Sequence, residues 1–293
     1  MFSLDLLLEA LLFGVLLGCF YAAVSIGLSV SFGLLDVPHV AHPAIMVLGS
    51  YCTWFVSSRT GLDPMLSGAA LMPVFFVLGV LIYRFYYETF EKRGTDAGVR
   101  GLAFFFGVAF IVEVGLILMF GVDQRSVEAA YIGKSLSVGD FRIPLRMIAA
   151  FAVALLLTFS LSVFLGKTFI GRAIKAVAQD EPALRLMGAN PVRIKQWAFG
   201  IATAAAALGG AMLIVIGPVD PGMDRVYIGR TFAVVVLAGL GSMTGTIAAG
   251  LVLGISESIV LIHPDLGASW APAVSFTLLL IVLGVRPQGL FGR

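Results

Sequence analysis

Residues 6–43 read LLLEALLFGVLLGCFYAAVSIGLSVSFGLLDVPHVAHP, and they contain the two patterns that decide the fold. Residues 6–33 carry a single charge, Glu9, and are long enough to cross the roughly 30 Å hydrocarbon core of a bilayer as a helix. Residues 36–43 then hold an aspartate, two prolines and two of the three histidines. Pro38 and Pro43 remove backbone donors and so enforce a break, and Pro43 suits the first turn of a following helix.

The composition of the whole chain extends this pattern. Of 293 residues, 59% are hydrophobic and 12% are charged, against roughly 45–50% and about 25% in soluble domains. We therefore expect an integral membrane protein. The formal net charge of +2 is too small to indicate a nucleic-acid partner. No basic residues precede the first apolar run, so we expect a retained span rather than a cleaved signal peptide.

Apolar runs of spanning length recur along the chain. We predict them at 6–33, 41–57, 65–87, 101–120, 146–165, 196–216, 229–262 with a break in its middle, and 269–285. Unpaired backbone is too costly in lipid, and the alternating pattern of a barrel strand is absent, so the runs should be helices. We expect one all-α transmembrane domain over 1–293, with about eight membrane helices plus broken or half spans.

Lysines and arginines gather on one side of this predicted bundle. If the segments 88–100 and 167–195 share a side with the C-terminus, that side holds twelve of the nineteen basic residues, Arg84 included. Cytoplasmic loops of membrane proteins carry such an excess, so we expect these segments in the cytoplasm. The loop 121–146 would then be a short, turn-rich external excursion.

The polar segment 166–197, GKTFIGRAIKAVAQDEPALRLMGANPVRIKQW, interrupts the apolar pattern. It predicts two short helices, 168–179 and 182–187, with a stop at Gly188. A polar helical insertion between two spans can meet a partner protein, although an ordinary interfacial helix has the same composition. Its Gly-Lys-Thr is not a phosphate-binding loop, because a membrane helix precedes it and Leu161 stands where the first glycine is needed.

A second break, in LAGLGSMTGTIAAGLVLGISES (237–258), resembles the first. Its glycines form small-x-x-x-small pairs at 241/245 and 250/254, a spacing that lets helices approach closely in lipid. Paired interruptions of membrane helices are the best indication in a sequence of a substrate route, because freed helix ends can line a pathway. Our candidates for the translocation pathway at the two breaks are His39, His42, Pro43, Gly241, Ser242, Thr244 and Gly245.

Two acidic residues stand inside predicted spans. Glu113 lies deep in one of them and should face a wet pathway or a subunit interface, or else pack in a protonated state, because a carboxylate in lipid is costly. We place Glu257 near the outer membrane surface. The predicted external loop 217–230 carries charges of both signs that could contact a docked protein.

Residues 171–212, GRAIKAVAQDEPALRLMGANPVRIKQWAFGIATAAAALGGAM, resemble the coupling region in permease subunits of branched-chain amino acid type ABC importers. Three more stretches agree in the family's order: GLLDVPHVAHPAIMVLGSY (33–51), VVLAGLGSMTGTIAAGLVLGISES (235–258) and VRPQGLFG (285–292). The family's first break usually reads Asn-Phe-Ala-His-Gly. Here His42 and the alanine before it match, whereas His39 and Pro43 differ.

This resemblance implies a passive pathway subunit of a type II ABC importer in the bacterial inner membrane. Its partners would be a sister permease, alike or different, two cytoplasmic ATPases and a periplasmic substrate-binding protein. The chain would bind no cofactor and catalyse nothing, because ATP and Mg²⁺ belong to the ATPases. The segment 168–191 would form the coupling helices in the ATPase groove, with contacts from Ala178, Asp180, Glu181, Ala183, Leu184, Met187 and Gly188.

The implied substrates are branched-chain or related amino acids, and the alternatives within this importer class are urea, short amides and small aromatic or aliphatic carboxylic acids. An ion- or proton-coupled secondary transporter would instead use the histidines and Glu113 as a relay. Such a protein has no mechanical need for the segment 171–191. His39 and His42 could share a helix face, but no third and fourth ligand complete a metal site beyond Asp36, so we expect no metal.

Overall fold

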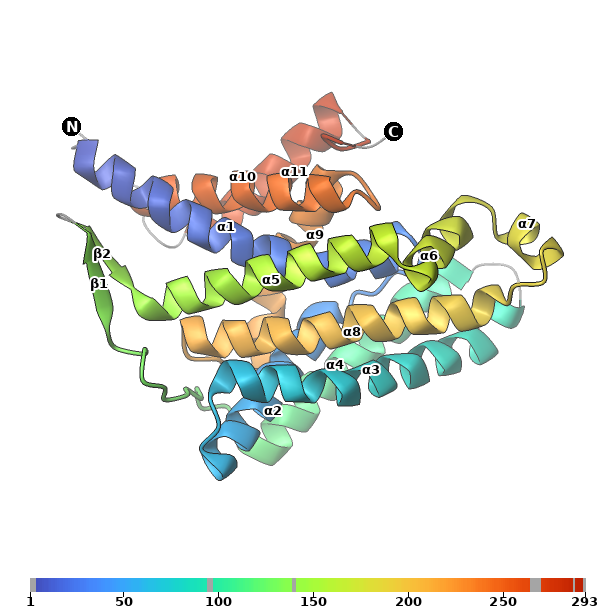
Figure 1. Cartoon of the computed structure of the whole chain (residues 1–293), viewed down its shortest axis with the longest axis horizontal. Helices are drawn as coiled ribbons and strands as arrows, with labels where there is room; N and C mark the ends of the chain where they lie inside the picture. The colour runs from blue at the N-terminus through green and yellow to red at the C-terminus, as the bar shows by residue number, and fades with distance from the viewer. Residues whose placement is uncertain (1–3, 94–96, 139–140, 264–269, 287, 292–293) are drawn as a thin grey trace.

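The computed structural model of the protein describes residues 4–93, 97–138, 141–263, 270–286 and 288–291. They are mostly helical (Figure 1). The elements are α1 (Leu4–Gly33), α2 (His42–Thr60), α3 (Pro64–Thr89), η1 (Glu91–Arg93), α4 (Ala97–Phe120), β1 (Ser135–Val138), β2 (Phe141–Pro144), α5 (Leu145–Lys167), α6 (Phe169–Gln179), α7 (Glu181–Leu186), α8 (Pro191–Ile216), η2 (Pro221–Met223), α9 (Asp224–Ala238), α10 (Met243–Leu261) and α11 (Ala271–Val285).

Six of the described helices are long and apolar enough to cross a membrane: α1, α3, α4, α5, α8 and α10. Each coincides with a span, or half of the broken span, predicted from the sequence. Helix α11 is apolar but shorter. The chain is therefore a multi-pass helical membrane protein, and the expected total of about eight membrane helices stays a prediction.

The core is built around α8, which packs against α1, α2, α3 and α5 (Figure 1). Its middle is a run of small buried residues that includes Ala204–Ala207 and Gly210. Their size lets the neighbouring backbones come close, and Ser50 on α2 donates a hydrogen bond of 2.7 Å to the Gly210 carbonyl. Close packing of small residues and hydrogen bonds between helices stabilise such bundles in lipid.

Helices α1 and α10 pack closely along their length. A Cβ atom added at Gly18 would lie 2.7 Å from the Leu251 Cα, and one at Gly250 would lie 2.7 Å from the Gly18 carbonyl oxygen. The predicted 250/254 pair therefore does lie at a close helix–helix contact, and its partners on α1 are Gly14 and Gly18.

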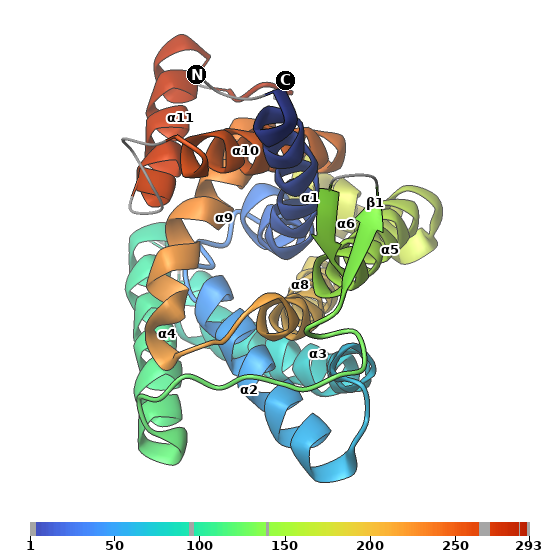
Figure 2. The ribbon, with the colours of Figure 1, turned by 90° about the vertical axis from the view of Figure 1, so that its left-hand side faces the viewer.

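The described structure departs from an all-α fold at one place. Strands β1 and β2 pair antiparallel, with Ser135 opposite Pro144, inside the segment that we expected to be a turn-rich loop (Figure 2). In β1 serines alternate with apolar residues, which is the pattern of a strand with two different faces. The same loop pairs with the α8–α9 connection through a bridge between Arg125 and Val219.

The predicted broken span is two helices joined by a tight turn at 239–242. Gly239 and Gly241 have φ angles of +84° and +79°, which residues with a side chain rarely adopt. The Ser242 N–H donates to the Gly239 carbonyl (3.0 Å) and closes the turn. Helix α9 begins at Asp224 rather than at 229, so half of the expected external loop 217–230 is helical.

Candidate functional site

The predicted coupling segment forms two helices, α6 and α7, which extend from the ends of α5 and α8 (Figure 1). Each has a side-chain cap at its first turn: the Thr168 hydroxyl accepts from Gly171 N–H (3.0 Å), and the Asp180 carboxylate accepts from Ala183 N–H (2.9 Å). Gly188 follows with a φ of +81° and turns the chain back toward α8. The helices lie within a residue of their predicted positions.

The tip of this element exposes large apolar side chains. Leu186 is 91% exposed and Met187 is 84% exposed, and α7 buries none of its residues. Of the seven predicted coupling residues, Glu181 and Leu184 are partly buried and the other five are exposed. Exposed apolar groups on a polar element are typical of a protein contact. Leu186 was not among the residues predicted from the sequence, although it stands directly before Met187.

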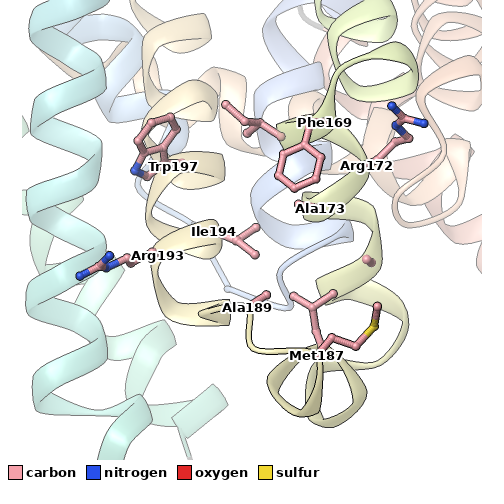
Figure 3. Close-up of a pocket in the computed structure, with 11 residues that line it drawn as sticks. Phe169, Arg172, Ala173, Met187, Ala189, Arg193, Ile194 and Trp197 are labelled. Carbon is pink, nitrogen blue, oxygen red and sulfur yellow. The ribbon is translucent and has the colours of Figure 1, made fainter.

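An open apolar groove of about 770 Å³ lies between α6 and α8, beside this tip. Figure 3 shows Phe169 and Trp197 toward one end of the groove and Met187 at the other. Leu184 and Ile194 also line it, so the predicted residues Leu184 and Met187 lie at a concave surface as well as at an exposed tip.

The first membrane break is buried inside the bundle. His39, His42 and Pro43 are all buried. The His42 ring donates from Nε2 to the Val24 carbonyl of α1 over 2.9 Å. The His39 ring packs against Phe199 and Phe105, with centroid distances of 4.4 and 5.1 Å. Neither ring nitrogen of His39 finds a hydrogen-bond partner among the described residues.

The second break touches the start of the first. A Cβ atom added at Gly241 would lie 3.0 Å from the Gly33 carbonyl oxygen, directly after which the first break begins. The Ser242 hydroxyl accepts from Gly245 N–H (3.1 Å) and caps α10, and Thr244 is exposed. The C-terminal motif also reaches this turn, because a Cβ atom added at Gly289 would lie 2.5 Å from the Gly239 Cα. Leu290 N–H also donates to the Leu237 carbonyl (2.8 Å) at the end of α9. The structure therefore brings the two breaks together, although their side chains mostly pack and cap.

The two acidic residues in the spans are both paired with arginines of α9. Glu113 on α4 lies 2.5 Å from Arg225, whose side chain is 73% exposed. Glu257 on α10 lies 3.0 Å from Arg230 and is fully buried, and it also accepts hydrogen bonds from Tyr21 (2.5 Å) and Ser275. We placed Glu257 near the outer surface and both arginines in an external loop. Both arginines lie instead on the helix α9. Glu257 is buried within the protein, and its depth in the membrane stays a prediction.

The described residues contain no group of three or more histidine, cysteine, aspartate or glutamate side chains placed to hold a metal ion. What these residues do form is a multi-pass helical bundle with a pair of short, exposed helices and two adjoining helix breaks. That arrangement defines a multi-pass helical membrane protein that carries an exposed polar element beside its apolar helices.

Comparison with known proteins identifies the family. The family described as "Branched-chain amino acid transport system / permease component" matches residues 10–283. The chain is 26% identical over 297 residues to the permease protein BraD of Pseudomonas aeruginosa, covering 98% of this chain and 96% of BraD. It is 27% identical over 296 residues to LivH of Escherichia coli K12, covering 98% and 96%. Both are named high-affinity branched-chain amino acid transport system permease proteins.

A shorter match joins the chain to a second type of permease. LivM of Escherichia coli K12 is also named a high-affinity branched-chain amino acid transport system permease protein. It is 33% identical to this chain over 151 residues, which cover 50% of this chain and 34% of LivM. The chain belongs to the family of permease components of branched-chain amino acid transport systems, as the resemblance in its sequence predicted.

Proposed function

We propose that the chain is the passive pathway subunit of an ATP-driven importer that moves branched-chain or related amino acids into the cytoplasm. The observation that carries this proposal is the match to the permease family over residues 10–283, with full-length relatives named for branched-chain amino acids. The names of these relatives favour amino acids over urea, amides or carboxylic acids as substrates.

The remaining parts of the importer follow from this function. We place the chain in a bacterial inner membrane, with the type II architecture and about eight membrane helices, beside a sister permease. The half-length similarity to LivM is consistent with a sister subunit of related sequence. A periplasmic binding protein would deliver the substrate, and two cytoplasmic ATPases would bind ATP and Mg²⁺, so the chain would need no cofactor of its own.

Helices α6 and α7 would receive the motion of the ATPases. Their exposed apolar tip, with Leu186 and Met187, and the groove beside it offer the kind of surface that a partner protein covers. The pathway would run along α9 and the two helix breaks, which lie next to each other. His39, His42 and Glu113 remain our candidates beside it, together with the turn at 239–242.

The test is uptake of radiolabelled leucine, isoleucine and valine by cells with and without this gene, and by the purified importer in proteoliposomes. We expect uptake that requires the ATPases, ATP and the binding protein. Competition by unlabelled urea, acetamide or benzoate tests the alternative substrates. Uptake by the permease alone, driven by a proton gradient, would overturn the proposal in favour of a secondary transporter.

A further inference from the structure

We propose that Lys195 is a positioning residue that fixes the coupling helix α7 to the membrane helices, so that movement of α7 reaches the first membrane break. This inference rests on the proposed function, because it assigns a part in coupling to a residue outside both the coupling tip and the breaks. Lys195 lies on α8, one turn after its start.

The Lys195 ammonium joins three elements of the fold. Its Nζ atom lies 2.7 Å from a carboxylate oxygen of Glu181 on α7 and 2.8 Å from a carboxylate oxygen of Glu91 in η1, directly after α3. The Lys195 side chain is only 11% exposed, and the two carboxylates are 27% and 22% exposed. We call these three residues the lysine node. One cation thus bridges α7, α8 and η1.

Helix α7 has little else to hold it in place. None of its residues is buried, and its other ion pair, Arg185 with Glu181, lies within the helix itself. A helix of this length is not stable alone in water, since nucleation costs more than one or two hydrogen bonds return. The direction in which α7 points is therefore set to a large extent by the bond from Glu181 to Lys195.

Beyond the node, packed side chains continue to the first break. The Tyr83 hydroxyl on α3 donates to the second carboxylate oxygen of Glu91 over 2.7 Å. The Tyr83 ring packs on Phe199 of α8 (5.7 Å between centroids), and Phe199 packs on His39 (4.4 Å). Tyr83, Phe199 and His39 are fully buried. Contiguous packing of this kind can carry coupling between distant sites, and a change in coupling is the evidence it requires.

The charges of the node explain why it should act as one unit. A buried lysine is stable when carboxylates compensate its charge, and removing one partner leaves the other charges partly buried without compensation. Replacing Lys195 by methionine would leave Glu91 and Glu181 facing each other, and they would repel. Arginine keeps the charge and both partners in reach, so Lys195→Arg should retain the function.

The experiment uses the complete importer, with sister permease, ATPases and binding protein, in proteoliposomes. We would compare wild type, Lys195→Met, Lys195→Arg and Glu91→Gln, and measure amino acid uptake per ATP hydrolysed as well as the ATPase subunits that copurify. The matched control is Arg84→Met, because Arg84 also forms an ion pair with a glutamate near the end of α3, but an exposed one.

We expect Lys195→Met to keep its ATPase subunits, since the exposed tip is unchanged, while uptake per ATP falls about tenfold. Glu91→Gln should lower the same ratio to a smaller extent, and Lys195→Arg and Arg84→Met should leave it near the wild-type value. An unchanged ratio in both Lys195→Met and Glu91→Gln would overturn the role of the node. So would loss of the ATPase subunits from Lys195→Met, because Lys195 would then serve docking. Failure of the wild-type importer would instead refute the proposed function.

Discussion

At the scale of single residues, the least expected finding is the pair of arginines on α9. Arg230 lies in the interior beside Glu257, and its guanidinium also stands over the rings of Tyr21 and Tyr227, 5.6 and 5.4 Å from their centroids. A buried charge is tolerated only with such compensation. The Glu257 carboxylate, with bonds from α1, α9 and α11, therefore joins helices that are distant in sequence.

Removal of the Glu257 carboxylate should destabilise the fold strongly. We expect Glu257→Ala to cost about 3–5 kcal/mol, because Arg230 would remain mostly buried, with its side chain 14% exposed, without its counter-charge. The measurement is the thermal unfolding of the purified chain in detergent. As a control, Glu113→Ala should cost clearly less, since the partner of Glu113, Arg225, is 73% exposed and can be solvated. Equal losses in both variants would contradict this explanation.

At the scale of elements, α7 depends on one partly buried glutamate. Burial raises the pKa of the Glu181 carboxyl, but hydrogen bonds and charges from Lys195 and Arg185 outweigh it and hold the pKa below its ordinary value of 4.5. A lowered pKa in the folded state adds stability above the ordinary value, and this stability is lost as the pH falls through the folded pKa.

The pH dependence of stability should therefore separate the wild type from Glu181→Gln. We expect the wild type to unfold at a higher temperature than Glu181→Gln at pH 7, and the difference to shrink as the pH is lowered below about 4.5. The measurement is the melting temperature of both proteins between pH 7 and pH 3.5. A difference that stays constant over this range would show that the charge of Glu181 is not what matters.

A second prediction at this scale concerns the stability that the contact between α1 and α10 contributes. A Cβ atom at Gly250 would meet the α1 backbone, so Gly250→Val must separate the two helices. We expect a loss of about 1–3 kcal/mol or more, as is usual for overpacking. Gly115→Val on α4 is the control, because open space surrounds that position. Thermal unfolding of the two variants measures the difference, and a stable Gly250→Val would contradict the packing described here.

At the scale of the whole molecule, two groups of exposed apolar side chains bear on how the protein is covered. Members of the first group lie on α3, α4, α5 and α11, at positions such as Val77, Ile111 and Leu280, where lipid or a sister subunit can cover them. Figure 2 shows α4, α9 and α11 along one side of the molecule. The second group is the tip at Leu186 and Met187, on a polar element outside the apolar spans, where we propose that the ATPase covers it.

Polar substitution of this tip should impair assembly without impairing the fold. We expect Leu186→Ser combined with Met187→Ser to lower the amount of ATPase that copurifies with the permease at least about tenfold, since apolar anchors dominate such interfaces. The melting temperature of the permease alone should stay near that of the wild type, because Leu186 and Met187 are both largely exposed. Undiminished copurification would show that the tip is not the docking surface.

The sequence by itself determined the membrane class, the positions of six long apolar helices, the two capped short helices α6 and α7, and the family. These features depend on neighbours in the chain: apolar length fixes a span, while Thr168, Asp180 and Gly188 fix where a short helix starts and stops. The tertiary structure decided the partners. That Glu257 meets Arg230, that Lys195 joins Glu91 and Glu181, and that the two breaks adjoin each other all depend on contacts between distant segments, which no local pattern specifies. It also decided what the two histidines of the first break contact: the His42 ring donates to a helix carbonyl, and the His39 ring packs in an aromatic cluster.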